Sequence, residues 1–371
     1  MDRGSEQRRS EQHQSDRRES EQRRSDRRES DRRELDRRES SGKHHGRFAA
    51  VIIAGVAVLA VAGLGYAGIQ KKKAAEAASA KATAEADDSN TVTWQGKTYK
   101  YNQNLSNYLL LGVDKRTPAE TRVGKADAGQ ADALFLLSLN RKTKEMTLIS
   151  IPRDTMTDVE SFDLEGKSLG KSKDHISLSY GYGDGGAESC KLTQEAVSNL
   201  FYGLPIQGYL AMNLDGIPEL AKSVGGLTVT VPNNSLEYKY PEFSEGAEVT
   251  LTEENTETFV RSRDVDESQS AIYRMERQKA FLDAFSKKAK ECYEQNAKFA
   301  ADLFVAIKPY TVTNISEDRL MKLFQTADEG DGYTEWTVPG EGTQGLSYDE
   351  YHVDDDALYA KIMETFYQEI K

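Results

Sequence analysis

The chain has 371 residues, enough for one large domain or two, and carries 49 Lys and Arg against 61 Asp and Glu. The acidic excess lies after residue 73, where 31 Lys and Arg face 49 Asp and Glu. A domain this acidic argues against nucleic acid as a partner. It also makes any local group of arginines informative, because such a group opposes the charge of its surroundings.

Residues 1–47 form a charged tail that repeats a five-residue unit, as in Ser-Asp-Arg-Arg-Glu at 25–29 and again at 30–34. A period of five matches neither the 3.5 nor the 3.6 periodicity of helices, so no continuous apolar stripe exists. The tail holds 15 Lys and Arg and 12 Asp and Glu, whereas nucleic-acid binding favours a clear basic excess. We therefore predict a disordered, solvated cytoplasmic tail.

Residues 48–69 contain no charged side chain and are rich in Ala, Val and Gly. At about 1.5 Å per residue this run crosses the roughly 30 Å hydrocarbon core, so we predict a single transmembrane helix. The run is longer than a typical signal-peptide core and starts too far into the chain to be one. Six Lys and Arg lie within about 19 residues before it and four after it, which places the N-terminus in the cytoplasm. A Lys- and Ala-rich linker at 70–95 then leads into a predicted extracellular domain at 96–371.

Short strand patterns alternate with helical patterns along this domain. Gln95-Gly96 predicts a small hairpin over 91–101, and the polar, Gly-rich stretch 158–190 predicts a loop. Apolar or alternating runs predict strands at 107–113, 133–139, 146–151, 206–212, 227–231 and from 336 into a turn at 339–340. Helical spacing predicts helices at 191–203, 217–224, 251–261 and 270–293, with the acidic run 354–356 at a further helix start. Mixed strands and helices indicate a layered α/β domain.

The cysteines and isolated histidines give no metal motif. Cys190 and Cys292 leave two interpretations open, a disulfide in an extracellular domain or two buried thiols. No CxxC or His-Cys cluster predicts a zinc site. The G-x-G-x-x-G at 181–186 follows a polar stretch, and we expect no close helix after it with the acidic residue about 20 positions on that a dinucleotide fingerprint requires. His175 and His352 have no second histidine at ligand spacing and are expected to be surface or hydrogen-bonded residues.

Charged residues mark the ends of the three apolar runs between 107 and 151. Asp114 follows the first run, Asp132 precedes the second, and Arg153 follows the third. The end residues of buried strands lie at the rim of a sheet, where open α/β sheets bind ligands. Mg²⁺ takes one or two carboxylates and leaves room for phosphate oxygens, and the arginine fork suits phosphate. The pattern therefore suggests a divalent cation and a phosphate group at this rim.

A second polar cluster contains Arg261, Arg263, Arg274, Arg277 and Gln278. In extended chain Arg261 and Arg263, two residues apart, point the same way. Arg274 and Gln278, four residues apart, share one face of the predicted long helix. The competing interpretation is a solvated face paired with neighbouring Asp and Glu. The aspartates and Arg153 elsewhere in the chain favour a shared phosphate site.

Six stretches carry a resemblance to a known family. They are LLLGVD (109–114), ADALFLLSLN (131–140), LISIPRDT (148–155), VGGLTVTVP (224–232), FVRSRD (259–264) and RMERQKAFL (274–282). Their order and spacing over about residues 100–285 resemble the LytR-CpsA-Psr family, membrane-anchored enzymes of Gram-positive cell walls. The resemblance implies a three-layer α-β-α domain with a central mixed sheet and a family core at about 107–285.

The resemblance also implies a reaction. Such proteins move a glycopolymer, teichoic-acid-like or capsular, from a polyprenyl-pyrophosphate carrier onto the C6 hydroxyl of muramic acid in peptidoglycan. A phosphodiester forms, polyprenyl phosphate leaves, and apolar helices facing the sheet are expected to hold the lipid chain. By resemblance, Asp114 and Asp132 are the Mg²⁺-associated aspartates. The implied pyrophosphate-binding residues are Arg153, Arg261, Arg263, Arg274 and Gln278, and the implied catalytic residues are Asp114, Asp132, Arg153 and Arg263.

One position departs from the family pattern. Many members carry arginine two residues before the second aspartate, where this chain has Gln130. A neutral amide can still hydrogen-bond a phosphate, but the loss of one charge-assisted contact costs on the order of 1.5–3 kcal/mol. This departure keeps open a non-catalytic wall regulator that binds polyprenyl pyrophosphate. A separate alternative is a pyrophosphatase that hydrolyses the lipid carrier with water as the acceptor.

Overall fold

The computed structural model describes residues 91–116, 121–163, 165–296, 298–316, 319, 323, 333–345 and 348–370. The predicted tail, transmembrane segment and most of the linker lie outside these residues. Among the helices that are described, none is long and apolar enough to cross a membrane. The last linker positions, 91–95, already belong to a strand and its turn, so the folded domain begins earlier than residue 96.

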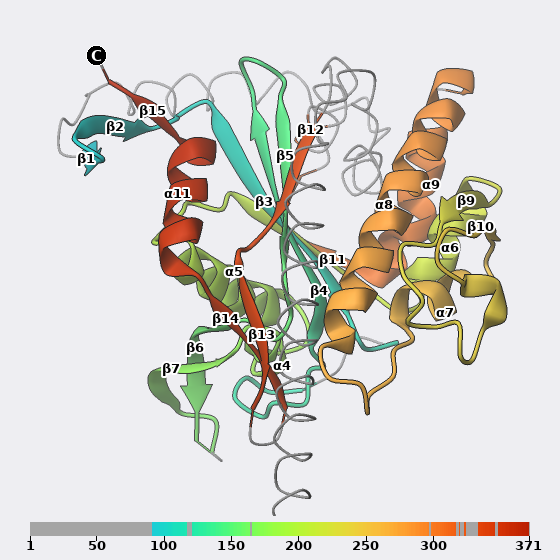
Figure 1. The fold of residues 1–371 in the computed structure, drawn as a ribbon, viewed down its shortest axis with the longest axis horizontal. Helices are drawn as coiled ribbons and strands as arrows, with labels where there is room; N and C mark the ends of the chain where they lie inside the picture. Colours follow the sequence, from blue (N-terminus) through green and yellow to red (C-terminus); the bar gives the residue numbers. More distant parts are fainter. Residues whose placement is uncertain are drawn as a thin grey trace, which may run out of the picture. The chain divides into compact units, whose positions relative to one another are not determined.

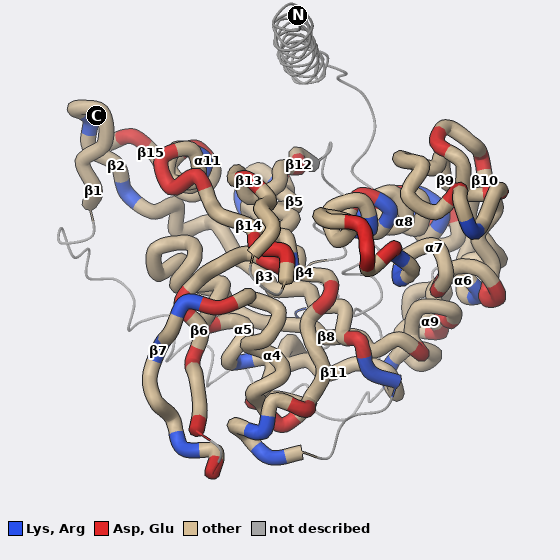
Figure 2. The backbone as a smooth tube through the Cα atoms, turned by 60° about the horizontal axis from the view of Figure 1, so that its bottom comes forward, with Lys and Arg blue, Asp and Glu red and all other residues tan. Residues whose placement is uncertain are grey.

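A six-stranded mixed sheet forms the middle layer of the described domain (Figure 1). Its order is β11-β8-β3-β4-β5-β12; the β8–β3 and β5–β12 pairs are parallel and the other pairs antiparallel. The strands are β3 (Leu105–Val113), β4 (Ala131–Asn140), β5 (Met146–Ile151), β8 (Gly208–Asn213), β11 (Thr311–Thr313) and β12 (Tyr333–Thr337). The three predicted central strands are confirmed. They are almost free of charge, as their tan colour in Figure 2 shows, which fits burial on both faces.

Helices cover both faces of the sheet and enclose two cores (Figure 1). One face packs against α6 (Gly216–Ser223), α7 (Thr256–Arg261), α8 (Ser270–Gln295) and α9 (Phe299–Ile307). The other packs against α4 (Leu178–Gly181), α5 (Ala187–Leu200) and α11 (Asp355–Phe366). Successive residues of β3 alternate between these cores, Leu110 in the first and Leu109 in the second, as the two-residue period of a strand requires. The predicted three-layer α/β architecture is confirmed.

Smaller hairpins and short helices surround the central layers. The predicted 91–101 hairpin is confirmed as β1 and β2, with Gln95 and Gly96 at positive φ in its turn. These peripheral elements are β1 (Thr91–Trp94), β2 (Lys97–Tyr101), β15 (Tyr367–Glu369), β6 (Met156–Phe162), β7 (Ser168–His175), β9 (Leu227–Thr230), β10 (Glu248–Leu251), β13 (Gly340–Gln344), β14 (Asp349–Val353), η1 (Pro241–Phe243) and η2 (Lys308–Tyr310).

The predicted loop over 158–190 is wrong. Residues 156–175 form the β6–β7 hairpin, and α4 and the start of α5 follow it. β7 is mostly exposed, and β6 buries Thr157 and Val159 on one face. Among the described residues of the hairpin only Val159 joins a hydrophobic core, so its sequence lacks the apolar alternation that marks a strand. Helix α5 begins at Ala187 because the Asp184 carboxylate accepts the backbone N–H groups of Gly186, Glu188 and Ser189.

The helix predicted over 251–261 is correct only in its second half. Leu251 ends β10 and pairs with Leu227 of β9, and α7 starts at Thr256. The strand pairing wins because it buries the Leu251 side chain completely. The long helix predicted at 270–293 is confirmed as α8.

Both cysteines are free thiols in the structure. Cys190 lies in the core between the sheet and α5, whereas Cys292 packs against the core between the sheet and α8. The sheet separates the two sulfur atoms, so the disulfide interpretation is wrong.

Residues beyond 285 complete the sheet. They supply both edge strands, β11 beside β8 and β12 beside β5, and helix α11 closes the second core with Leu358 and Phe366, which are fully buried. Residues 107–285 therefore contain the central strands but lack parts of the sheet and of the second core.

Replacing Phe366 with alanine tests this dependence. Its ring packs edge-on against Phe201, 6.3 Å between centroids, so Phe366→Ala leaves a cavity and should cost about 3–5 kcal/mol. The matched control is Glu364→Ala on the exposed side of the same helix, expected to stay within about 0.5 kcal/mol. Equilibrium urea unfolding followed by tryptophan fluorescence compares the two. Equal effects would show that α11 is not part of the cooperative core.

Candidate active site

A β-bulge places Asp132 at the start of β4. Gly112 of β3 pairs with Ala133, but the next residue, Val113, pairs with Ala131. Asp132 is thus the extra residue of the bulge. Bulges re-aim side chains next to functional sites, and here Asp132 and its neighbour Ala133 both line the same pocket.

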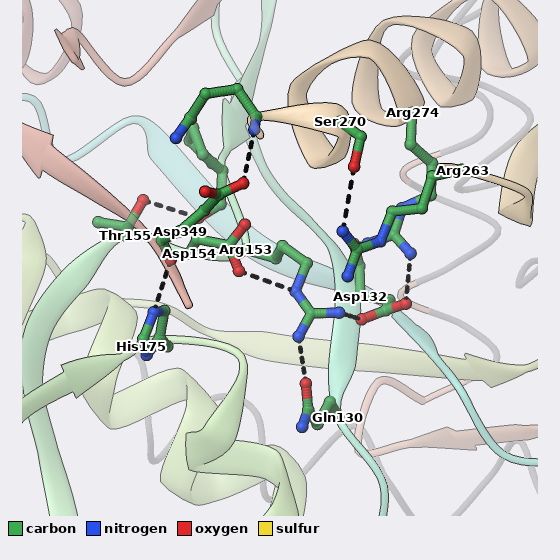
Figure 3. A network of polar contacts seen from close by, with 12 residues as sticks. Gln130, Asp132, Arg153, Asp154, Thr155, His175, Arg263, Ser270, Arg274 and Asp349 are labelled. Carbon is green, nitrogen blue, oxygen red and sulfur yellow. Dashed lines mark hydrogen bonds and ion pairs between the residues drawn. The ribbon is translucent and has the colours of Figure 1, made fainter. Parts of the chain in front are cut away.

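The Asp132 carboxylate lies between two arginines (Figure 3). One oxygen accepts from Arg153 Nη1, and the other accepts from Arg274 Nη1 at 2.7 Å. Arg274 also donates to the Asp132 backbone carbonyl at 3.4 Å. Its side chain is only 4% exposed, and this burial lowers the pKa of Arg274, while Asp132 opposes the shift. The strand rim and the long helix therefore meet through one carboxylate.

Gln130 connects this pair to Asp114. Its side-chain oxygen accepts a hydrogen bond from Arg153 Nη2, and its backbone N–H donates to Asp114 Oδ1 at 2.6 Å. Arginine has no acceptor atom, so an arginine at this position could not hold Arg153 in this way. From the sequence, Gln130 is a neutral amide that can still hydrogen-bond a phosphate. In the structure it orients a phosphate-binding candidate instead.

Asp114 and Asp132 offer hard oxygen ligands on either side of Gln130. The described residues contain no group of three or more His, Cys, Asp or Glu that could hold a metal. Two carboxylates nevertheless fit Mg²⁺, which commonly binds through one or two carboxylates and completes its octahedral shell with waters and phosphate oxygens. The oxygen donors are thus of the kind that Mg²⁺ prefers, and both Asp132 oxygens accept hydrogen bonds from Arg153 and Arg274.

Arg261 and Arg263 face different spaces, so the expectation that they point the same way is wrong. Arg261 is the last residue of α7, half exposed and 3.3 Å from Glu257, and it lines an apolar pocket. Arg263 follows the helix end, donates to Ser270 Oγ at 3.1 Å and lines a polar groove. The same-side rule holds for extended chain, and here Arg261 is still helical. Arg274 and Gln278 share one helix face, as predicted, and both line the apolar pocket.

The apolar pocket lies between the sheet and α6, α7 and α8 and has a cavity volume of about 150 Å³. Its apolar lining includes Leu110, Phe135, Leu210, Met212, Leu220, Phe281 and Phe285. Four polar residues also line it: Asp132, Arg261, Arg274 and Gln278. Within the described structure, Arg274 Nε and Gln278 Oε1 are buried and have no hydrogen-bond partner. Buried unpaired polar atoms are costly, and a ligand with donor and acceptor atoms would satisfy them.

Arg277 is a buried residue whose role the sequence did not reveal. Its Nε donates to the Phe259 carbonyl at 2.9 Å and its Nη2 donates to the Ser262 carbonyl, while Nη1 reaches Asn233 and Ser235. Burial lowers its pKa to about 10, so it remains charged at neutral pH. Arg277 thereby ties α8 to the segment that carries Arg261 and Arg263. Nothing in the sequence distinguishes it from Arg274, because burial depends on the packing of α7.

The fold and this cluster define a class of α/β domains in which an apolar pocket opens onto arginines and aspartates. Such a site suits a ligand with an apolar chain and a phosphate group. The chain belongs to the LytR_cpsA_psr family, whose model matches residues 66–365. This confirms the family that the six sequence stretches indicated.

Relatives and solved structures agree with this assignment. The polyisoprenyl-teichoic acid–peptidoglycan teichoic acid transferase TagU of Bacillus licheniformis is 28% identical over 255 residues, covering 67% of this chain and 73% of the relative. The TagU of Bacillus mycoides is 29% identical over 255 residues, covering 67% and 74%. Protein gbs0355 of Streptococcus agalactiae has a TM-score of 0.55 at 19% identity, covering 70% and 86%. TagT bound to LI-WTA has a TM-score of 0.53 at 19% identity, covering 71% and 90%. At these identities the structural likeness establishes the fold.

Removing the Arg277 guanidinium should loosen the segment that holds Arg261 and Arg263. Arg277→Met leaves buried carbonyls without donors, and we expect a loss of about 3 kcal/mol of unfolding free energy. Arg261→Met, which removes a half-exposed ion pair, should change it by about 1 kcal/mol or less. Urea unfolding of both variants measures the difference. If Arg277→Met were as mild as the control, these buried hydrogen bonds would not stabilise the fold.

Proposed function

We propose that this chain is a transferase that moves a glycopolymer, teichoic-acid-like or capsular, from a polyprenyl-pyrophosphate carrier to peptidoglycan with formation of a phosphodiester. The observation that carries this proposal is the junction between the apolar pocket and the arginine–aspartate cluster. An apolar chain and a diphosphate on one ligand need these two environments side by side. The names of the TagU relatives support the same polymer and acceptor for this chain.

The pocket suits the lipid end of such a donor. Phe281 and Phe285 of α8 lie on one side and Leu110 and Phe135 of the sheet on the other, so an apolar chain would replace water against apolar walls. Arg261, Arg274 and Gln278 line the same pocket, where they would meet the first phosphate of the carrier. Arg274 Nε supplies a donor that no described residue uses.

The reaction requires attack of an acceptor hydroxyl oxygen on the phosphorus nearest the glycan. A new P–O bond forms, the bond to the bridging oxygen breaks, and polyprenyl phosphate leaves with the electron pair. The hydroxyl proton passes to a carboxylate of the site. Arg153, Arg263 and Arg274 stabilise the charge that develops on the phosphate oxygens and on the leaving group. Asp132 keeps two of these guanidinium groups oriented before the ligand arrives.

Asp114 and Asp132 would hold Mg²⁺ when the diphosphate binds. The ion would supply further positive charge to the phosphate oxygens. The two carboxylates offset part of the charge of Arg153, Arg263 and Arg274, and the diphosphate would offset the charge of the ion.

We further propose that residues 48–69 anchor the chain in the cell membrane, with residues 1–47 in the cytoplasm and the catalytic domain outside the cell. The apolar length of 48–69 and the positive charges before it support this topology. A membrane anchor would keep the pocket close to a lipid-linked donor.

Gln130 is the feature that favoured a non-catalytic regulator. Its hydrogen bond to Arg153 gives it a positioning role that is compatible with catalysis. A pyrophosphatase remains the alternative in which water replaces the acceptor hydroxyl, and product analysis separates the three functions.

The full chain, purified in detergent, should be incubated with a polyprenyl-pyrophosphate saccharide, a peptidoglycan oligomer and Mg²⁺. Mass spectrometry is expected to detect saccharide phosphate attached to the oligomer. Arg263→Ala should lower the rate by about 10²–10³-fold, because one donor to the developing charge is lost. Arg141→Ala is the matched control, since Arg141 directly follows the end of β4 that lies opposite Asp132.

Other outcomes of this experiment would indicate one of the two alternative functions. Released saccharide phosphate without attachment would indicate the pyrophosphatase. Tight donor binding without any product would indicate the regulator.

Removal of divalent cations tests the role of Asp114 and Asp132. Chelation with EDTA should abolish transfer, and added Mg²⁺ should restore it, because the diphosphate would then regain its counter-charge. Asp114→Asn should raise the Mg²⁺ concentration required for half-maximal rate by tenfold or more. Full activity in EDTA would contradict the metal assignment.

A further inference from the structure

We propose that a polar groove beside Arg153 and Arg263 binds the acceptor, a strand of linked sugars that presents a hydroxyl group to the phosphate site. This inference rests on the proposed function and assigns a binding role to the C-terminal β13–β14 hairpin. Neither the six sequence stretches nor the predicted site residues include any part of that hairpin.

The groove adjoins the cluster on its other side from the apolar pocket. Gln130, Arg153, Asp154 and Arg263 line it, and none of these four lines the apolar pocket. Asp132 and Arg274 line the apolar pocket and not the groove. Asp132 forms an ion pair with Arg153, and Arg274 binds the same Asp132 carboxylate. The arginine–aspartate network thus forms the partition between an apolar and a polar space.

In-line displacement favours the groove for the acceptor. The attacking and leaving oxygens of a phosphoryl transfer lie on opposite sides of the phosphorus. If the lipid occupies the apolar pocket, polyprenyl phosphate leaves toward that pocket. The attacking hydroxyl must then arrive from the opposite side of the partition, which is the groove. Asp154 is the cluster carboxylate that lines this side, so it can take the hydroxyl proton.

The outer wall of the groove is fixed by the β13–β14 hairpin (Figure 3). The Asp349 carboxylate accepts from Ser268 Oγ at 2.9 Å and from the Gln269 backbone N–H at 2.5 Å, and its carbonyl lies 2.8 Å from His175 Nε2. The Tyr351 N–H donates to the Asp154 carbonyl at 2.8 Å. One short strand is therefore tied to the start of α8, to β7 and to the segment that carries Arg153.

The lining has the character of a sugar site. Its cavity volume is about 810 Å³, in the upper part of the roughly 300–1,000 Å³ of small-molecule pockets, so it has room for a short run of linked sugars. Tyr348 is 76% exposed beside the groove, and its ring stands at right angles to His175, 6.4 Å between centroids. An exposed aromatic ring among polar groups offers an apolar face to a pyranose ring and a hydroxyl to its edge.

The test compares Tyr348→Ala with Tyr238→Ala in the full chain. Tyr238 is also exposed, at 64%, but lines neither space. Steady-state transfer rates are measured with the acceptor oligosaccharide varied at saturating donor, and then with the donor varied. Tyr348→Ala should raise the KM for the acceptor about tenfold and change the KM for the donor less than twofold. Tyr238→Ala should change neither, and Tyr348→Trp should restore acceptor binding.

The opposite pattern overturns the proposal. A raised donor KM with an unchanged acceptor KM would assign the groove to the glycan of the donor. Unchanged values for both would show that the groove binds no sugar.

A binding experiment separates this inference from the proposed function. Calorimetry with a soluble peptidoglycan oligosaccharide and no donor needs no turnover. Binding that is weakened by Tyr348→Ala and not by Tyr238→Ala would support the groove even if the chain transferred nothing. Equal binding by both variants would refute the assignment of the groove to the acceptor. It would not bear on transferase activity, which the mass spectrometry of the products tests separately.

Discussion

One carboxylate between two guanidinium groups holds the site together. Asp132 joins Arg153, at the end of a central strand, to Arg274, on the buried face of α8. A buried arginine without a counter-charge is strongly destabilising, so the packing of α8 against the sheet depends on this residue. The same two guanidinium groups are those that a phosphate would engage. Asp132 thus maintains their spacing in the absence of ligand, and a diphosphate entering the site would compete with it or share its partners.

The sequence could predict the centre of this domain but not its margins. The apolar runs of β3, β4 and β5 are unmistakable, and the rule that strand ends meet at a rim correctly grouped Asp132 with Arg153. The divergence of Arg261 from Arg263 follows from the end of α7 at Arg261, which is also where the predicted helix ends, so the rule for extended chain did not apply to this pair. The start of α7 was misplaced, because Leu251 pairs with β9. That second error comes from tertiary packing that overrides local pattern.

Gln130 shows that a residue that departs from a family motif can still contribute to the same site. Viewed as a lost charge, it argued for a weakened phosphate site. Its side-chain oxygen instead accepts a hydrogen bond from Arg153, while its backbone N–H donates to Asp114. One residue thus orients both an arginine and an aspartate of the site. Local sequence cannot distinguish a residue that would bind the ligand from one that positions its neighbour. The distinction depends on which side-chain atom faces which partner.

The position of the two edge strands has a consequence for how the chain reaches its native state. As synthesis proceeds, β3, β4, β5 and β8 exist long before β11 and β12, and β12 must pair with a strand that lies 187 positions earlier in register. Contacts between such distant parts of a chain form slowly, and an incomplete sheet offers bare edges to other chains in the meantime. We therefore expect the docking of about the last sixty residues to be the slow step of folding. The intermediate before that step is a sheet with two unpaired edge strands, and we expect it to be prone to aggregation.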